Sequence, residues 1–280
     1  MRILHCKNTS ELAKNLSKDL GLDLIKIDIS KFANEETSIT IYEDINKQDI
    51  LITHTLFPET NDKLMQFLLI INFLKNKGAK SVHALIPYLP YSRMDKSTTH
   101  KSPTSQSIAL LLESAGLDGI ITLDLHSEAT KNFFKIPVKN ITALEIFKQP
   151  LLKYKDQDCV IISPDLGGKI RCEQISNFLS KPLVVLQKKR TKSGIEIKGT
   201  YDNLQNKHCI VIDDIISTGE TLLHTIKFLK KSGAKSINIM VTHNLIRDYN
   251  ILNEIGSQVN NITLSKPTAL RLSSLGALHI

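Results

Sequence analysis

The stretch "CIVIDDIISTGETLL", residues 209–223, decides how this chain is interpreted. It begins as a continuous apolar run, which is typical of a buried parallel strand, and it ends in sequence with helical periodicity. Asp213 and Asp214 come at the end of the apolar run. Because ligands bind at the carboxyl ends of strands in open α/β sheets, this position favours a binding site.

The short turn between the strand and the helix indicates which ligand the site binds. Its residues offer hydroxyl and backbone N–H groups at a helix start, where the helix dipole favours a phosphate. They are Ser217, Thr218, Gly219, Glu220 and Thr221. Glycine allows close approach of the backbone, and two acids suit two vicinal hydroxyls. The pattern predicts a site for a sugar phosphate; the alternative is a helix start whose side chains only cap loose amides.

Apolar runs alternate with helix-period segments along most of the chain. Expected strands include residues 49–56, 81–89, 119–126, 159–165, 182–190, 209–214 and 236–243. Several intervening helical segments end in Lys and Gly, a helix C-terminus signal. Alternation of strand and helix predicts an α/β fold with mainly parallel sheets flanked by helices.

An internal match divides the chain in two. "FLKNKGAKSVHALIP", starting at Phe73, resembles "FLKKSGAKSINIMVT", starting at Phe228. Two copies of one α/β unit explain this match, although a common helix-to-strand turn could also recur by chance. We expect a connecting helix near residues 141–155 and two domains, 1–145 and 146–280.

Composition limits the possible functions. The chain has 280 residues, 41% hydrophobic residues and a net charge of +8, which suits an anionic partner. Aromatic residues make up 5% and Trp is absent, which argues against a nucleic-acid stacking surface. The four cysteines are scattered, and no long apolar run is present. We therefore expect a soluble cytoplasmic protein that binds neither nucleic acid nor membranes.

Further motifs, by their order and spacing, identify a family that the chain resembles. They are "FANEE" at 32–36, "IPYLPYSRMD" at 86–95, "ITLDLHS" at 121–127, "ISPDLGGKIR" at 162–171 and "QKKR" at 187–190. Together with the strand, acid pair and T-G-x-T turn, they resemble the signatures of the ribose-phosphate diphosphokinases. The resemblance runs from about Phe32 to His243. It implies two similar phosphoribosyltransferase-like domains, with ATP bound by the first and ribose 5-phosphate by the second.

The resemblance also implies an activity, a cofactor and site residues. The diphosphoryl group of ATP would pass to the anomeric hydroxyl of ribose 5-phosphate. His126 and Asp165 would each hold magnesium, with Asp124 near His126. Lys188 and Arg190 would stabilise the transferring group, and Arg190 would also contact the phosphate of ribose 5-phosphate. The two residues lie two apart, so on an extended strand they face the same way. From charge alone, these two cations are a solvated basic strand end.

ATP-binding residues follow from the same resemblance. They are Phe32, Asn34, Glu35, Glu36, Arg93 and Met94. Without it, Phe32 is a core residue and Asn34 a turn residue. The chain departs from the family pattern at four positions: Glu35 for a glycine, Thr40 for a common arginine, Met94 for a glutamine and Glu220 for a small residue. These departures leave ATP use and acceptor identity open.

Three alternatives therefore remain at this point. The chain could use a larger acceptor such as ADP-ribose, could be a phosphoribosyltransferase, or could be a non-catalytic member that regulates a paralogue. The family also implies a homo-oligomer, either a dimer or a hexamer.

Overall fold

The computed structural model describes residues 1–97, 102–191, 194–199 and 204–269, with the backbone only at 188–191, 194–199 and 269. The described chain forms two units, each with its own sheet. The first comprises Met1–Ile141 together with the described residues from Lys266 onward, and the second comprises Thr142–Ser265.

The first unit contains a seven-stranded sheet of order β3-β2-β1-β4-β5-β6-β7. Its strands are β1 (Arg2–His5), β2 (Leu24–Lys31), β3 (Thr37–Ile41), β4 (Asp49–Thr53), β5 (Ser81–Ile86), β6 (Gly119–Leu123) and β7 (Val138–Ile141). All neighbouring strands are parallel except β2 and β3, which form an antiparallel hairpin at one edge.

Helices cover the sheet of the first unit. They are α1 (Ser10–Leu20), α2 (Thr60–Asn76) and α3 (Thr104–Ser114), with short 3-10 turns η1 (Lys7–Thr9), η2 (Glu128–Phe133) and η3 (Pro267–Ala269). Side chains of α2 and α3, such as Phe67 and Ile108, share one core with alternate residues of the central strands. Helix α1 packs against β1 and β2 through its own buried residues, Leu12 and Leu16.

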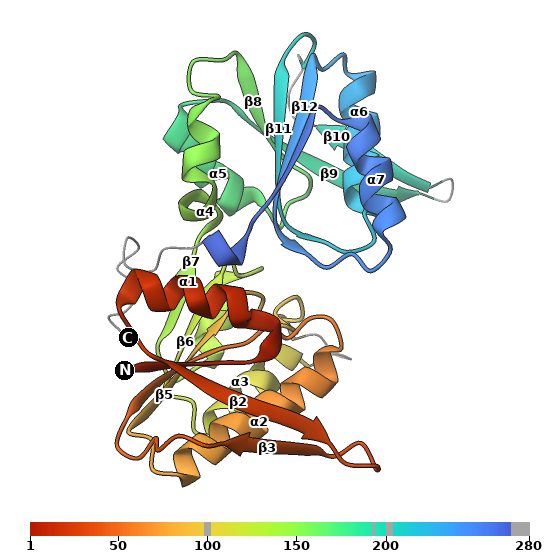
Figure 1. The fold of residues 1–280 in the computed structure, drawn as a ribbon. Coiled ribbons are helices and arrows are strands. Elements are labelled where there is room, and N and C mark those ends of the chain that lie inside the picture. The colour runs from red at the N-terminus through yellow and green to blue at the C-terminus, as the bar shows by residue number, and fades with distance from the viewer. Residues whose placement is uncertain (98–101, 192–193, 200–203, 270–280) are drawn as a thin grey trace. The chain divides into compact units, whose positions relative to one another are not determined.

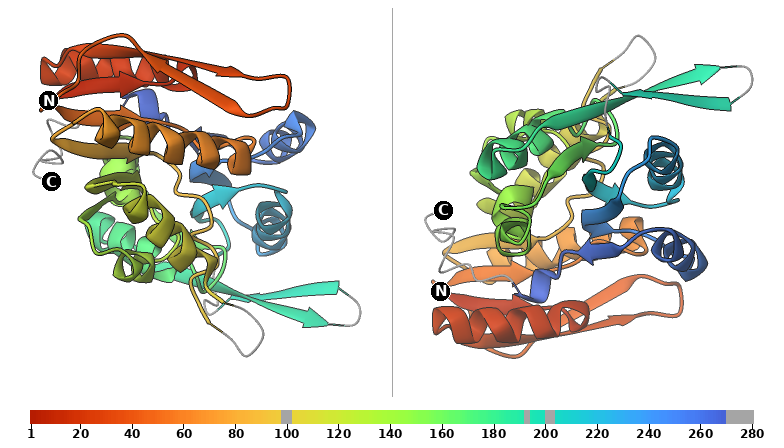
Figure 2. Two further views of the ribbon diagram at one scale, coloured as in Figure 1. Left: turned by 90° about the horizontal axis from the view of Figure 1, so that it is seen from below. Right: turned by 90° about the horizontal axis from the view of Figure 1, so that it is seen from above.

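The second unit contains a six-stranded sheet of order β10-β9-β8-β11-β12-β13. Its strands are β8 (Cys159–Ser163), β9 (Leu183–Thr191), β10 (Gly194–Gly199), β11 (His208–Ile216), β12 (Ser236–Asn244) and β13 (Asn261–Leu264). Its helices are α4 (Ala143–Leu152), α5 (Lys169–Leu179), α6 (Glu220–Lys231) and α7 (Tyr249–Gln258). Only β9 and β10 pair in antiparallel fashion among these described strands, and Figure 2 shows this hairpin extending from the body of the unit.

Strand β11 is buried on both faces. Cys209 and Val211 belong to the core beneath α6 and α7, whereas Ile210 and Ile212 belong to the core beneath α4 and α5. Figure 1 shows these two helix pairs on opposite faces of the sheet. The period-2 alternation of a strand therefore explains why its sequence is a continuous apolar run.

The repeated segments of sequence adopt the same local structure in the two units. Both follow a helix, α2 or α6, and both lead into a strand, β5 or β12. Gly78 and Gly233 have φ of 83° and 74°, and the following alanines donate to the carbonyls of Leu74 and Leu229 at 3.1 Å. The same helix-ending hydrogen bond at both positions supports two copies of one α/β unit.

The observed elements differ from expectation mainly at their ends. Strand β5 ends before Pro87, which lacks an N–H donor, and β6 ends before Asp124, whose φ is 38°. The expected connecting helix is α4. The first unit ends at Ile141, whereas the sequence predicted a domain boundary after residue 145. The described residues from Lys266 onward also belong to the first unit, and the sequence had placed them in the second domain. Within the described residues, no helix is long and apolar enough to cross a membrane.

Candidate functional site

Two buried acids lie near the carboxyl end of β11. Asp213 and Asp214 are 7% and 5% exposed. Oδ1 of Asp213 accepts a hydrogen bond from the backbone N–H of Asp214 at 3.0 Å. Nη2 of Arg171, on α5, lies 3.6 Å from Oδ2 of Asp214. The acid pair is thus held within the protein, and a buried cation accompanies it.

The surroundings of Asp213 favour its neutral form. Burial raises the pKa of Asp213 well above its usual range, and the carboxylates of Asp214 and Asp165 raise it further. The guanidinium of Arg171 acts in the opposite direction. The three acids are therefore close enough to interact, and a positively charged or hydrogen-bonding ligand would stabilise their ionised forms.

The turn after β8 holds Asp165 in a defined position. Oγ of Ser163 donates to the carbonyl of Asp165 at 2.7 Å, and the backbone N–H of Gly168 donates to its Oδ1 at 3.1 Å. A Cβ at Gly168 would lie 2.9 Å from Oγ of Ser163, so the turn has no room for a side chain there. Since β8 and β11 are adjacent parallel strands, their carboxyl ends bring Asp165 beside the acid pair.

The predicted phosphate turn leads directly into α6. Gly219 is the N-cap residue with φ of 74°, and its carbonyl accepts the N–H of Leu223 at 2.9 Å. A Cβ at this glycine would lie 2.5 Å from Cγ2 of Ile251 and 3.0 Å from Cδ1 of Ile255, both on α7. Thr218 and Glu220 are exposed beside it. The helix start is thus open to a ligand on one side and supported by α7 on the other.

The predicted catalytic cations lie on the hairpin of the second unit. The backbone of Lys188 and Arg190 belongs to β9, opposite Ile197 and Ile195 of β10. Their extended conformation is confirmed, and residues two apart on a strand face the same side. The placement of their side chains lies outside the described part of the chain.

In the first unit, Asp124 and His126 lie in the turn after β6. Asp124 is 4% exposed, and its backbone N–H donates to the carbonyl of Ile141 at 2.7 Å. Oδ1 of Asn140, on β7, accepts the N–H of Leu125 at 3.0 Å. These bonds hold the turn at the carboxyl edge of the sheet and leave His126 half-buried.

The β2–β3 hairpin carries the first group of predicted ATP-binding residues. Phe32, Asn34, Glu35 and Glu36 are all exposed, and Phe32 is 59% exposed, so it is not a core residue. Glu35 has φ of 68°, in the left-handed region that glycine adopts without strain. This conformation explains why the family pattern has glycine at the position.

The second group lies in the loop after β5. Arg93 and Met94 are exposed there, and the carbonyl of Met94 accepts Oγ of Ser105 at 2.9 Å. In the sheet, β1 and β4 separate β5 from β2, so the two groups start from strands that are not neighbours. Both are instead connected to the first turn of α2.

Two adjacent residues at the start of α2 make these connections. Oδ1 of Asn61 accepts a hydrogen bond from the hydroxyl of Tyr91, in the loop that carries Arg93. Nζ of Lys31, next to Phe32, lies 2.5 Å from Oδ2 of Asp62. Asn61, Asp62 and Arg171 were not among the site residues predicted from sequence, although Arg171 ends the family-like motif at 162–171. The sequence signal that could have identified Arg171 is its position: it is a charged residue in the first turn of the helix that follows the glycine turn.

The comparisons with known proteins cover nearly the whole chain. The profile for the N-terminal domain of ribose phosphate pyrophosphokinase matches residues 1–116, and that for the phosphoribosyl transferase domain matches residues 131–251. A ribose-phosphate pyrophosphokinase of Thermosipho africanus is 34% identical over 269 residues, which are 95% of this chain and 85% of that protein. One of Mycoplasma genitalium is 35% identical, over 88% of this chain and 75% of that protein.

A solved structure agrees with these relatives. The crystal structure of phosphoribosylpyrophosphate synthetase from Mycobacterium smegmatis has a TM-score of 0.89 and 27% identity, and the match covers 99% of this chain and 98% of that one. Fold and site thus define a two-domain α/β transferase whose second domain is of the phosphoribosyl transferase type. The chain belongs to the ribose-phosphate pyrophosphokinase family, and it is an enzyme. These relatives do not favour the phosphoribosyltransferase alternative or the regulatory alternative.

Proposed function

We propose that the chain transfers the β,γ-diphosphoryl group of ATP to the anomeric hydroxyl of ribose 5-phosphate, which yields phosphoribosyl diphosphate and AMP. One observation carries the proposal: the buried acids Asp213 and Asp214 lie near the carboxyl end of β11, and the turn that follows this strand opens helix α6 at Gly219. Carboxylates suit the ribose hydroxyls, and the helix start suits the 5-phosphate.

In this proposal, binding and charge neutralisation supply most of the rate enhancement. Asp213 and Asp214 orient the ribose, while residues 217–221 hold its phosphate. Phe32, Asn34, Glu35 and Glu36 belong to one ATP-binding segment, and Arg93 and Met94 belong to the other. Lys188 and Arg190 stabilise the negative charge on the diphosphoryl group as it transfers.

The donor atoms of the second unit fit a divalent cation. Three interacting carboxylates, those of Asp165, Asp213 and Asp214, have one guanidinium near them, so negative charge remains to be balanced. Oxygen ligands are those that magnesium prefers. Among the described residues, no group of three or more His, Cys, Asp and Glu side chains is arranged to hold a metal ion. Magnesium keeps several waters and is bound through one or two carboxylates together with substrate phosphates.

We therefore propose magnesium as the cofactor, and we propose that Asp165 and His126 each hold magnesium. When bound, the cation would neutralise charge on the phosphate oxygens. The same proposal includes a cytoplasmic homo-oligomer, a dimer or a hexamer, and light scattering on the purified protein measures its size. Binding to nucleic acid or membranes forms no part of the proposal.

The test is a product assay on the purified protein with ATP, magnesium and ribose 5-phosphate. We expect AMP and phosphoribosyl diphosphate in equal amounts, and we expect Asp213→Asn to abolish most of this activity. Asp158→Asn is the matched control, because Asp158 forms an ion pair with Lys207 at 2.6 Å at the amino end of β8. Parallel reactions contain ADP-ribose as acceptor, or a nucleobase with phosphoribosyl diphosphate and no ATP. Product only in one of these parallel reactions would contradict the proposal.

A further inference from the structure

Arg171 is a buried cation that the proposed chemistry leaves without a role. It lies in the first turn of α5 and is 8% exposed as a residue. Nη2 of Arg171 lies 3.6 Å from Oδ2 of Asp214, and each of these side chains is 7% exposed. Arginine is rarely buried unless it is paired, and removing one partner of a buried pair leaves an uncompensated charge.

The guanidinium also lies against the turn that holds Asp165. A Cβ at Gly168 would lie 3.6 Å from Nη1 of Arg171 and 2.9 Å from Oγ of Ser163. Nη1 of Arg171 thus borders the space beside Gly168, while Nη2 is near Asp214. Arg171 therefore connects the carboxyl ends of two neighbouring strands, β8 and β11.

The ion pair distinguishes the two adjacent acids, although the guanidinium acts on Asp213 as well. Asp214 has a buried cationic partner, whereas Asp213 accepts the backbone N–H of Asp214 at 3.0 Å. A carboxylate fixed by a guanidinium has fewer lone pairs left for a ligand than its neighbour. A fixed Asp214 would in turn determine where the backbone places Asp213.

We propose that Arg171 is a positioning residue for the sugar phosphate: its guanidinium fixes Asp214 against the β8–α5 turn, so that Asp213 meets the ribose hydroxyls. The inference rests on the proposed function, because it assigns the acids to ribose 5-phosphate. Arg171 does not touch the reacting atoms and acts through Asp214.

The test measures ribose 5-phosphate binding by calorimetry without ATP or magnesium, together with steady-state kinetics. We expect Arg171→Met to weaken binding about tenfold to a hundredfold. The KM for ribose 5-phosphate should rise while the KM for ATP stays unchanged, and Arg171→Lys should restore part of the affinity. A residue that only stabilises the fold would lower the melting temperature without this selectivity.

A double-mutant cycle tests whether Arg171 acts through Asp214. If it does, Arg171→Met combined with Asp214→Asn binds no more weakly than Asp214→Asn alone. The paired variant also leaves no unpaired buried charge between these two positions, so it remains informative if Arg171→Met fails to fold. If the affinity losses of the two single variants instead multiply in the double variant, the inference is wrong.

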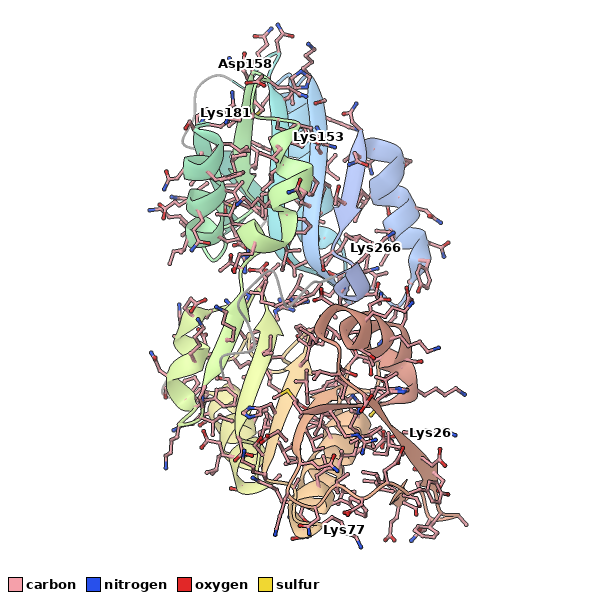
Figure 3. All side chains as sticks on the ribbon, turned by 60° about the vertical axis from the view of Figure 1, so that its left-hand side comes forward. Lys26, Lys77, Lys153, Asp158, Lys181 and Lys266 are labelled. Atoms are coloured by element: carbon pink, nitrogen blue, oxygen red, sulfur yellow. The ribbon has the colours of Figure 1, made fainter. Side chains whose placement is uncertain are left out.

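Lys207→Met is the matched control. It breaks the ion pair between Lys207 and Asp158. Asp158, labelled in Figure 3, comes just before β8, so this pair lies at the amino ends of the strands and the acid pair lies near their carboxyl ends. We expect this variant to bind ribose 5-phosphate like the unaltered chain. If Arg171→Met folds and binds ribose 5-phosphate with unchanged affinity, this inference is wrong, whereas the proposed function is unaffected. Failure of the unaltered chain to form AMP and phosphoribosyl diphosphate in the product assay would overturn the proposed function and, with it, this inference.

Discussion

His54 is a buried titratable residue in the core of the first unit. It is 1% exposed, and its Nδ1 donates to the carbonyl of Thr55 at 2.8 Å. Its Nε2 is buried, with no hydrogen-bond partner in the described part of the chain. The ring lies edge-on to Phe67, with centroids 5.5 Å apart. Burial lowers the pKa of His54 from 6.5 to about 4, so the folded protein keeps this ring neutral.

This pKa predicts a loss of stability in acid. The unfolded chain binds a proton near the ordinary pKa of 6.5, whereas the folded chain does so only near 4. The contribution of the neutral His54 to the free energy of unfolding is therefore fully present above the unfolded-state pKa of 6.5. It decreases as the pH falls toward the folded-state pKa of about 4. Between about pH 7.5 and pH 5, we expect His54 to account for a loss of about 2 kcal/mol in the free energy of unfolding.

Urea unfolding at the two pH values measures this effect. The His54→Gln variant should lose less stability than the unaltered chain over the same interval. His5→Gln, which removes an imidazole from the adjacent strand β1, is the control. Equal pH dependence of the unaltered chain and His54→Gln would contradict the prediction.

Gly219 is a second residue with a specific physical requirement. Its φ of 74° is strained for any residue with a side chain. An added Cβ would also lie too close to Ile251 and Ile255. Gly21 has a similar φ of 65°, but nothing lies within 4 Å of its Cβ position. Gly21→Ala therefore isolates the backbone strain, which costs about 1 kcal/mol.

We expect Gly219→Ala to lower the free energy of unfolding more than Gly21→Ala does, because steric overlap adds to the strain. A shifted turn should also bind ribose 5-phosphate about tenfold more weakly, whereas Gly21→Ala should bind it normally. Denaturant unfolding and calorimetry measure the two effects. Normal ribose 5-phosphate binding by Gly219→Ala would show that the turn does not hold the phosphate.

At the scale of elements, the first turn of α2 connects the two proposed ATP-binding segments. Asn61 accepts the hydroxyl of Tyr91, and Asp62 pairs with Lys31. The exposed ion pair is screened by solvent, so we assign more of the positioning to the Asn61 contact. Helix α2 is itself held by buried residues such as Phe67 and Ile70, which makes it a rigid support.

We predict that Asn61→Ala raises the KM for ATP about three- to tenfold, because the loop that carries Arg93 loses a hydrogen bond. The KM for ribose 5-phosphate should not change. Asn76→Ala is the control, since Asn76 lies at the other end of α2 on exposed surface, where it donates to Oδ1 of Asn72 at 2.8 Å. Steady-state kinetics with each substrate varied in turn distinguishes the outcomes, and a rise in both KM values would argue for general damage.

At the scale of the whole molecule, the second unit contains complete cores on both faces of its sheet. A fragment of residues 142–265 should therefore fold cooperatively by itself. Thr142 begins α4 with a capping box: its N–H donates to Oε2 of Glu145 at 2.7 Å, and its Oγ1 accepts the N–H of Glu145 at 3.3 Å.

A fragment of residues 146–265 lacks this capping box. We expect it to melt at least about 5 °C below the 142–265 fragment, because a lost cap costs about 1 kcal/mol and the buried core residue Ala143 is removed as well. Thermal unfolding followed by circular dichroism compares the two. A 142–265 fragment without a cooperative transition would show that the second unit depends on the rest of the chain.

Local sequence was sufficient for the alternation of strands and helices and for the strand, acid pair, turn and helix around Asp213. These features depend on hydrophobic periodicity and on residues close together in the chain. The repeated helix-to-strand segment was equally visible, because Gly78 and Gly233 end their helices by the same hydrogen bond. The family motifs also predicted the family that the comparisons confirm.

Tertiary structure alone decided which distant residues meet. Arg171 reaches Asp214 because β8 and β11 pair in parallel, and Tyr91 reaches Asn61 because the loop after β5 passes the start of α2. Lys266 and the described residues after it group with the first unit, where Nδ2 of Asn15 donates to the carbonyl of Thr268 at 2.7 Å. Sequence periodicity specifies the buried face of each element, but strand order and register determine which side chains become neighbours across the sheet.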